Sequence, residues 1–255
     1  MLILVGALLV SYLVPLAMYF YLVSLRTDDA EYKKDCFTLL WKGVLLVFPV
    51  FGFSLVCNLL FSLLNINERF PIVELIFSNF VLKAFSEELM KFLNARKIIN
   101  KNSSSVSFLD LMVYTTISAI GFELLEAIVY MFSTNVGQIL VRGFTNMHAG
   151  FGLIMGYFIA KGIKKGHKNP YVLGILVSTL IHGAYDLFLD DMFDDTFLIV
   201  VPLLVCAICV IVNIYAFFFF RKKQNDPYYT GLLFPEKAAA ALSAEGTQAE
   251  TTDSE

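Results

Sequence analysis

The chain has 255 residues, of which 58% are hydrophobic and 16% are charged, and its formal net charge is −3 at pH 7. A soluble domain is about 45–50% apolar and about 25% charged, so this composition predicts a protein that crosses a membrane several times. The small negative charge and the lack of a basic patch with interleaved aromatic residues argue against a nucleic-acid partner.

Apolar segments recur from residue 2 to residue 220. The first has no basic residues before it and no small-residue cleavage site after it, which predicts a retained span rather than a signal peptide. A span takes roughly 20 residues. By that length about seven segments qualify, namely 2–25, 38–64, 70–95, 107–133, 138–161, 170–190 and 196–220. We therefore expect an all-α fold, a polytopic membrane helix bundle.

The last residues differ in composition from the rest of the chain. Residues 221–255 begin with three basic residues and then become polar, acidic and low in complexity. Such a segment buries too little apolar surface to offset the entropy lost on ordering, so we predict a disordered cytoplasmic tail. Residues 1–220 are then expected to form one transmembrane domain, without an internal repeat.

The basic residues alternate between the two sets of loops. One set carries only Arg69 and Arg142, beside an acidic run at 190–195. The other set carries Arg26, Lys33, Lys34, Arg96, Lys97, Lys101, Lys161, Lys164, Lys165, Lys168, Arg221, Lys222 and Lys223. Because Lys and Arg gather on the cytoplasmic side of a membrane protein, we expect the N-terminus outside and the C-terminus inside. We expect a multi-pass protein of the plasma membrane.

Four consecutive segments hold nearly all the ionisable side chains inside the spans. In chain order they are Lys83, Glu87, Glu88, Lys91, Glu123, Glu126, Arg142, His148, His182 and Asp186. A charged side chain at a helix centre costs about 2.5–3.5 kcal/mol, so several carboxylates in lipid would cost on the order of 10 kcal/mol. We therefore predict that these side chains face the interior of the bundle and lie close to one another.

The spacing supports one shared cluster. Glu87 and Lys91 are four residues apart and share a helix face. His182 and Asp186 have the same spacing, so the carboxylate can fix the imidazole tautomer. A single ion pair between helices is often structural, but polar groups at similar depth on four successive helices indicate a functional site. The nearby glycines at 150, 152 and 156 are predicted to be close-packing positions.

Paired carboxylates beside two imidazoles suit hydrolysis. One glutamate can take a proton from a water that attacks a carbonyl, while a histidine stabilises the oxyanion or protonates the leaving amine. The same residues could hold a divalent metal such as Zn²⁺, although HExxH is absent. Ser86 and Ser178 lie near the cluster, but serine is common in spans as a helix hydrogen-bonder, and no nucleophilic Ser or Cys constellation is evident.

Four short motifs occur in order on successive spans. EELMK (87–91), FELLE (122–126), His148 and HGAYD (182–186) follow the patterns EExxK, FxxxE, a mid-span His and HxxxD. Together they resemble the PrsW-like intramembrane proteases, within the superfamily that includes the CAAX-prenyl endopeptidases and bacteriocin-processing enzymes. The CAAX branch would have His at position 126 and Arg at position 92, so the PrsW-like branch fits better. The resemblance covers about residues 80–190.

The resemblance implies an endopeptidase that cuts a membrane-embedded or membrane-tethered protein within the lipid bilayer. It implies a catalytic set that surrounds the attacking water, Glu87, Glu88, Glu126, His148 and His182. It implies supporting roles for Lys91, Phe122, Asp186 and Arg142. The superfamily has been discussed both as glutamic and as metal-dependent proteases, and the candidate ligands here are Glu126, His148 and His182. We favour Glu88 or Glu87 as general base without a required metal.

Alternatives from other functional classes remain open. A proton-coupled transporter or channel also uses buried Glu, His and Asp. Such folds usually show repeat symmetry, whereas here the polar groups occupy one block of the chain. An inactive membrane scaffold of the same fold would tolerate loss of Glu87, Glu88 or a histidine, and all are present.

Overall fold

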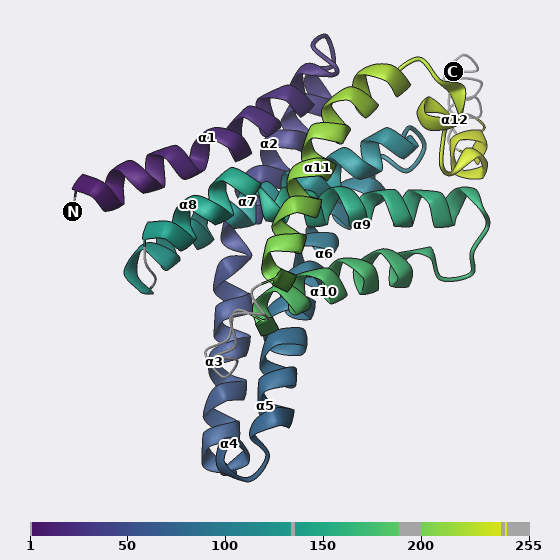
Figure 1. The fold of residues 1–255 in the computed structure, drawn as a ribbon. Coiled ribbons are helices and arrows are strands. Elements are labelled where there is room, and N and C mark those ends of the chain that lie inside the picture. The colour runs from purple at the N-terminus through teal and green to yellow at the C-terminus, as the bar shows by residue number, and fades with distance from the viewer. Residues whose placement is uncertain (1, 134–135, 189–199, 241–242, 244–255) are drawn as a thin grey trace, which may run out of the picture.

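The computed structural model describes residues 2–133, 136–188, 200–240 and 243 (Figure 1). These residues are almost entirely helical, and their one β contact is an isolated bridge between Ser107 and Leu232. The predicted all-α fold is confirmed. In chain order the elements are α1 (Leu2–Ser24), α2 (Ala30–Leu45), α3 (Val47–Leu63), α4 (Ile66–Arg69), α5 (Pro71–Phe77), the π-helix η1 (Ser78–Phe85), α6 (Ser86–Lys101), α7 (Phe108–Ser133), α8 (Val136–Thr145), α9 (Met147–Lys164), α10 (Pro170–Phe188), α11 (Val200–Lys223) and α12 (Pro227–Thr230).

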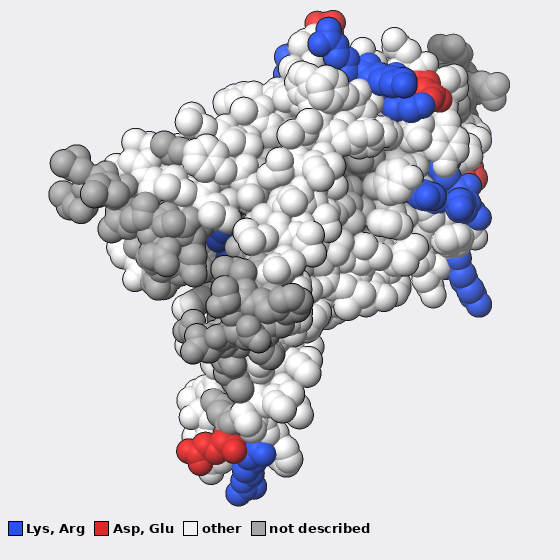
Figure 2. Space-filling view, viewed as in Figure 1, with Lys and Arg blue, Asp and Glu red and all other residues white. Residues whose placement is uncertain are grey.

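Within the described residues, 5 helical segments are long and apolar enough to cross a membrane. They are Val5–Ser24, Ala30–Leu63, Phe108–Tyr130, Pro170–Phe188 and Val200–Lys223. On the face drawn in Figure 2, charged side chains gather at the upper and right-hand margins and at the tip near α4. The broad surface between them is nearly free of charge, as expected for a surface that contacts lipid.

The predicted spans at 70–95 and 138–161 have a different structure from the other five. The first is built from α5, η1 and α6, and the second is divided into α8 and α9 at Asn146, whose φ is 48°. Both segments carry ionisable residues that lower their hydropathy. Such irregular backbone is tolerated at membrane depth only where it is surrounded by protein.

Helix α7 lies at the centre of the bundle and packs against α1, α2, α6 and α9. Small residues permit the close approach. A Cβ on Gly43 of α2 would come within 3.0 Å of the Cα of Gly121 on α7. Gly152 and Gly156 of α9 lie against the α7 backbone, and a Cβ on either would come within 2.8 Å of it. The predicted close-packing role of the glycines in α9 is confirmed.

The break between α8 and α9 is held by a side chain from α11. The Asn213 amide donates to the backbone carbonyls of Thr145 at 3.3 Å and Asn146 at 3.0 Å. The Asn146 amide donates to Oδ1 of Asn213 at 3.2 Å. The Asn146 carbonyl also accepts from the Gly150 N–H at 3.0 Å, so both carbonyls at the break have a partner within the protein. His148 follows the break by two residues, so the same bonds fix where α9 presents it.

Residues 221–234, which were predicted to belong to a disordered tail, are folded onto the end of the bundle. Helix α11 continues to Lys223, and Leu233 is buried and donates its N–H to the Val106 carbonyl at 2.9 Å. The Tyr229 ring packs edge-on against Phe219 of α11. Their apolar side chains explain the difference, because a few tyrosines and leucines within a polar segment suffice to dock it. Residues 241–242 and 244–255 lie outside the described part of the chain.

An ion pair fixes the turn into α12. The Asp226 side chain caps α12 by accepting from the Tyr228 N–H, and it lies 2.7 Å from the Lys223 ammonium. The Lys223 ammonium and the Tyr228 N–H together hold the pKa of Asp226 below its ordinary value.

Candidate active site

The two adjacent glutamates lie in the first turn of α6, directly after the π-helix. Glu88 is fully buried, and all its contacts lie within the bundle. Its Oε1 is 2.9 Å from the Lys91 ammonium and 3.0 Å from Nδ1 of His182, and its Oε2 accepts from the Ser178 hydroxyl at 2.8 Å. Both carboxylate oxygens are therefore held in place.

Glu87 is less constrained than its neighbour. Its Oε2 lies 3.1 Å from the Lys91 ammonium and 3.9 Å from Nε2 of His182. Among the described residues no hydrogen-bond donor contacts its Oε1, and the residue keeps 7% of its surface exposed. Of the two carboxylates, Glu87 is the one with an oxygen available to a water or substrate.

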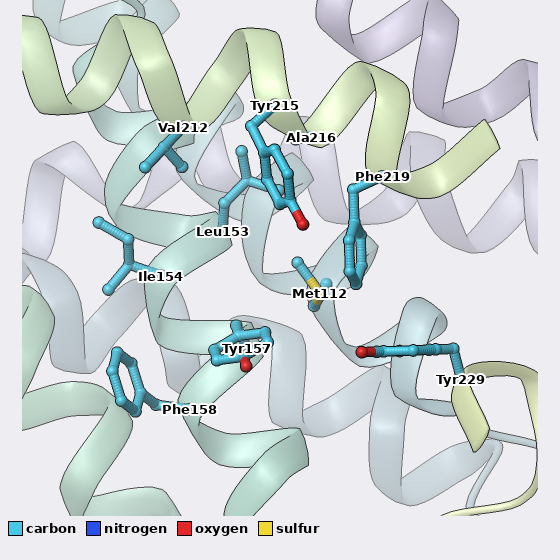
Figure 3. Close-up of a pocket in the computed structure, with 10 residues that line it drawn as sticks. All are labelled: Met112, Leu153, Ile154, Tyr157, Phe158, Val212, Tyr215, Ala216, Phe219 and Tyr229. Atoms are coloured by element: carbon cyan, nitrogen blue, oxygen red, sulfur yellow. The ribbon is translucent and has the colours of Figure 1, made fainter. Parts of the chain in front are cut away.

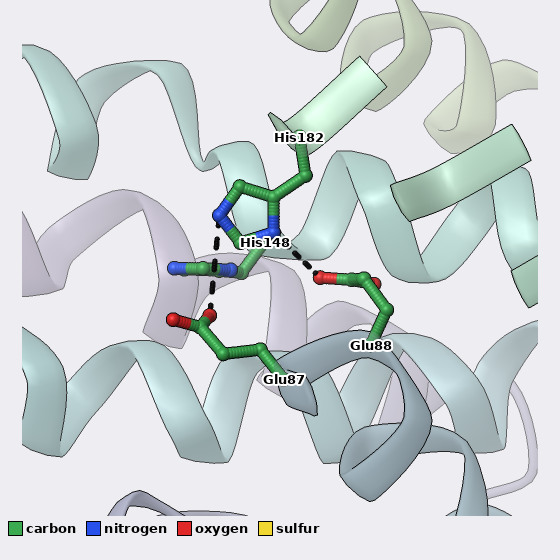
Figure 4. A group of neighbouring side chains, drawn as sticks. All are labelled: Glu87, Glu88, His148 and His182. Carbon is green, nitrogen blue, oxygen red and sulfur yellow. Dashed lines mark hydrogen bonds and ion pairs between the residues drawn. The ribbon is translucent and has the colours of Figure 1, made fainter. Parts of the chain in front are cut away.

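The two histidines are oriented alike. His148 places Nδ1 2.8 Å from the Lys91 ammonium and Nε2 2.5 Å from Glu126. His182 places Nδ1 against Glu88 and Nε2 3.4 Å from Asp186. Each ring thus turns Nδ1 towards the centre of the cluster and Nε2 towards an outer carboxylate. Figure 4 shows both rings beside the side chains of Glu87 and Glu88.

Aromatic rings enclose the histidines. The Phe151 ring stacks on His182, with centroids 4.8 Å apart and an angle of 23° between the planes. The Phe122 ring lies edge-on to His148, at 5.5 Å between centroids. The imidazoles are therefore held by packing as well as by hydrogen bonds, which fixes the positions of their nitrogens.

Lys91 is the buried cation of the site. Only 1% of its surface is exposed, and its ammonium contacts Glu87, Glu88 and His148. The ammonium also lies 4.3 Å from the centroid of the Phe122 ring, a cation–π distance. A charge so far from water is tolerated only when it is paired, and Lys91 in turn balances the adjacent carboxylates.

A second ion pair forms the outer side of the site. Arg142 of α8 donates to both oxygens of Glu126, at 3.1 and 3.2 Å, and its guanidinium carbon lies 4.2 Å from the centroid of the Tyr130 ring. Glu126 in turn contacts Nε2 of His148. Arg142 therefore acts on the cluster through Glu126 and also directly, because a guanidinium nitrogen lies 3.4 Å from Nε2 of His148.

The donor atoms suit a divalent metal. Glu87, Glu88, His148 and His182 each offer one ligand atom, and these atoms all lie within 4.8 Å of one another. Imidazole nitrogen and carboxylate oxygen are ligands that Zn²⁺ accepts. Metal-binding histidines usually turn their second nitrogen to a carboxylate, and Glu126 and Asp186 occupy those positions here. These four residues and the carboxylates behind them therefore fit a divalent metal such as Zn²⁺.

The structure brings together the predicted catalytic and supporting residues, but Lys83, which we also expect in the interior of the bundle, has an exposed side chain. Glu126, one of the candidate ligands, lies outside the donor group and contacts it through His148. Glu123 is buried, and neither of its carboxylate oxygens has a hydrogen-bond partner among the described residues. It faces a small cavity beside Glu126 and Arg142 rather than the donor group.

Some residues that contribute to the site are not evident from the sequence motifs. Ser178 was noted only as a helix hydrogen-bonder, yet it precedes His182 by one helical turn and bonds Glu88. That i,i+4 spacing was the available signal. Phe151 and Asn213 gave no signal, because an aromatic residue and a lone asparagine in a span have many structural roles.

Comparisons with known proteins agree with the motifs. Residues 35–217 match the model of a family described as PrsW family intramembrane metalloprotease. Protease PrsW of Clostridioides difficile (strain 630) is 31% identical over 126 residues, which are 46% of this chain and 53% of that protein. Protease PrsW of Oceanobacillus iheyensis is 28% identical over 162 residues, which are 61% of this chain and 74% of that protein. Protease PrsW of Geobacillus kaustophilus is 29% identical over 179 residues, with coverages of 68% and 74%.

The matches cover different shares of the relatives' lengths. The match spans about half the length of the Clostridioides difficile protein and about three quarters of the other two. No solved structure matches the chain at a significant level. The family match, however, takes in all four motifs and most of the helices described above. The chain belongs to the PrsW family of intramembrane metalloproteases.

Proposed function

We propose that the chain is an intramembrane endopeptidase that hydrolyses a peptide bond of a membrane-embedded or membrane-tethered protein. The observation that carries this proposal is the group formed by Glu87, Glu88, His148 and His182, buried in a bundle of apolar helices. The family of the chain and the protease names of its relatives support the same reaction class.

Glu88, His148 and His182 are the proposed ligands of a divalent metal of the zinc type. Three protein ligands and one open position are usual for catalytic zinc. When bound, the metal would polarise the scissile carbonyl and make a water more acidic. The family description and the outer carboxylates on both histidines favour this metal-dependent alternative over the metal-free reaction that we preferred from the sequence.

Glu87 is the proposed general base. Its Oε1 would take a proton from the attacking water and return it to the nitrogen of the leaving amine. Glu126 and Asp186 would orient His148 and His182, and Arg142 would hold Glu126. Lys91 would keep the carboxylates compensated while the site is shielded from bulk water.

We also propose seven membrane crossings, with the N-terminus outside and the C-terminus in the cytoplasm. The broken segments α5–α6 and α8–α9 would each count as one crossing. The alternation of Lys and Arg between the two sets of loops supports this arrangement. The membrane is then expected to be the plasma membrane.

The function can be tested by comparing new protein N-termini in the membranes of cells that carry the wild type or Glu87→Gln. Glu236→Gln is the matched control, because Glu236 is exposed and far from the donor group. Termini near membrane spans that appear with the wild type and the control, but not with Glu87→Gln, are the expected result. Identical termini in all three membranes at equal expression would contradict the proposal and favour a scaffold or transporter.

A further inference from the structure

A second cavity lies away from the donor group, between α7, α9 and α11 at the end that α12 covers (Figure 3). Its volume is about 270 Å³, and none of the proposed catalytic residues lines it. Leu153, Val212 and Phe219 form apolar walls. The cavity is therefore suited to a hydrocarbon group.

The cavity has a polar edge made by tyrosines. Tyr157, Tyr215 and Tyr229 line it, and Figure 3 shows their hydroxyl groups directed towards the space between the helices. Tyrosine is enriched at the boundary between hydrocarbon and head groups, where its ring is apolar and its hydroxyl is hydrated. The tyrosines therefore mark the depth at which a lipid head group would lie.

Lysines lie beside Tyr157, which lines the cavity, and beside Tyr228, which precedes the lining residue Tyr229 in the sequence. The Lys161 ammonium is 3.4 Å from the Tyr157 hydroxyl, and the Lys164 ammonium is 5.6 Å from the centroid of the Tyr228 ring. Lys223 also reaches this edge, but Asp226 pairs with it. In the described part of the chain no carboxylate pairs with Lys161 or Lys164. The edge of the cavity therefore carries uncompensated positive charge.

We propose that this cavity binds an acyl chain of an anionic phospholipid, whose phosphate contacts Lys161, Lys164 and the tyrosine hydroxyls. The apolar walls match the chain, and the unpaired ammonium groups match the phosphate. A transmembrane helix of a partner is about 10–12 Å wide and would not enter a cavity of this size. A lipid without net negative charge would leave the lysines uncompensated.

The binding site can be tested on the purified full chain in detergent, by native mass spectrometry with added phosphatidylglycerol or phosphatidylcholine. The test variant is K161Q/K164Q. K165Q/K168Q removes the same charge from neighbouring exposed positions and serves as the control. We expect the wild type and the control to retain one phosphatidylglycerol, and the test variant to bind it roughly tenfold more weakly. Phosphatidylcholine should bind the wild type more weakly than phosphatidylglycerol.

A second variant separates the cavity from the charges. Val212→Trp should fill the cavity while all lysines remain, and it should also abolish retention of the lipid. Inorganic phosphate at the concentration of the lipid should not displace it, because phosphate lacks the acyl chain. Equal binding of both lipids, equal loss in K165Q/K168Q, or full binding by Val212→Trp would overturn the proposal.

Discussion

At the scale of single residues, the site is organised around Lys91. Its ammonium contacts donor atoms of Glu87, Glu88 and His148, which are atoms that a metal would also use. In the absence of a metal the ammonium supplies the positive charge that the carboxylates need. Removing one partner of a buried ion pair costs about 3–5 kcal/mol, because the remaining charge is uncompensated.

Lys91→Met should therefore lower the stability of the metal-free protein by about 3 kcal/mol. Zinc should stabilise this variant more than it stabilises the wild type, because no ammonium then competes for the donors. Thermal unfolding in detergent, with chelator and with zinc, measures both effects. If zinc shifts the midpoints of the two proteins equally, Lys91 does not compete with the metal.

The proposed ligands and the proposed base should differ in metal content. Glu87→Gln should retain one metal ion per chain, whereas Glu88→Gln and His148→Gln should lose it. Asp186→Asn, which acts only through His182, should weaken metal binding about 10–100-fold. Elemental analysis of the purified variants after dialysis against a metal buffer makes the comparison. If Glu87→Gln lost the metal while Glu88→Gln and His148→Gln kept it, Glu87 would be a ligand of the metal and not the general base.

At the scale of helices, the position of Lys91 and Phe122 depends on how closely α2 approaches α7. A Cβ on Gly121 would overlap the backbone carbonyl of Leu40, and neither backbone can move without shifting its helix. Gly121 directly precedes Phe122, whose ring contacts the Lys91 ammonium. The packing of one glycine pair is thus connected to the geometry of the site.

Gly121→Ala should destabilise the protein by about 1–3 kcal/mol through overpacking. Gly52→Ala in α3 is the matched control, because a Cβ there meets no atom within 4 Å. The control should be neutral or slightly stabilising, since alanine favours helix more than glycine does. The midpoint of thermal unfolding measures both effects. Equal midpoints for the two variants would contradict the close contact between Gly121 and α2.

The same scale shows what could and could not be predicted from the sequence. Glu87, Glu126, His148 and His182 could be found, because ionisable residues are rare in apolar segments and each one demands an explanation. The irregular backbone before Glu87 and before His148 could not be predicted from the sequence. Apolar length does not reveal the π-turns of η1, and the partner that stabilises the break at Asn146 lies on α11, far along the chain.

The docking of residues 221–234 onto the bundle could not be predicted from their composition. A segment with few apolar residues is typical of disorder, and the prediction averaged over the whole of 221–255. Leu233 bonds to Val106 in the loop before α7, and Tyr229 packs against Phe219 of α11, so one of these partners is far away in the sequence. The composition of residues 221–255 does not show that the end of the bundle offers an apolar surface to them.

At the scale of the whole molecule, the proposed topology places the loop before α7 in the cytoplasm and α4 outside. Cysteines introduced at Ser104 and Glu68, both exposed, report on the two sides. A membrane-impermeant maleimide should label Glu68→Cys in intact cells, and Ser104→Cys only after the cells are opened. The reverse pattern would invert the topology, and labelling of both positions in intact cells would contradict a crossing between them.

The proposed reaction requires that this chain itself cuts peptide bonds with a metal and Glu87. The most direct measurement uses proteoliposomes that contain only the purified chain and a substrate identified from the membranes above, with product masses recorded over time. We expect the zinc-loaded wild type to cleave the substrate and a chelator to abolish cleavage. Metal-bound Glu87→Gln should cleave at a rate about 10²–10⁴-fold lower. An intact substrate with folded, metal-bound wild type, or cleavage by Glu87→Gln at the wild-type rate, would contradict it.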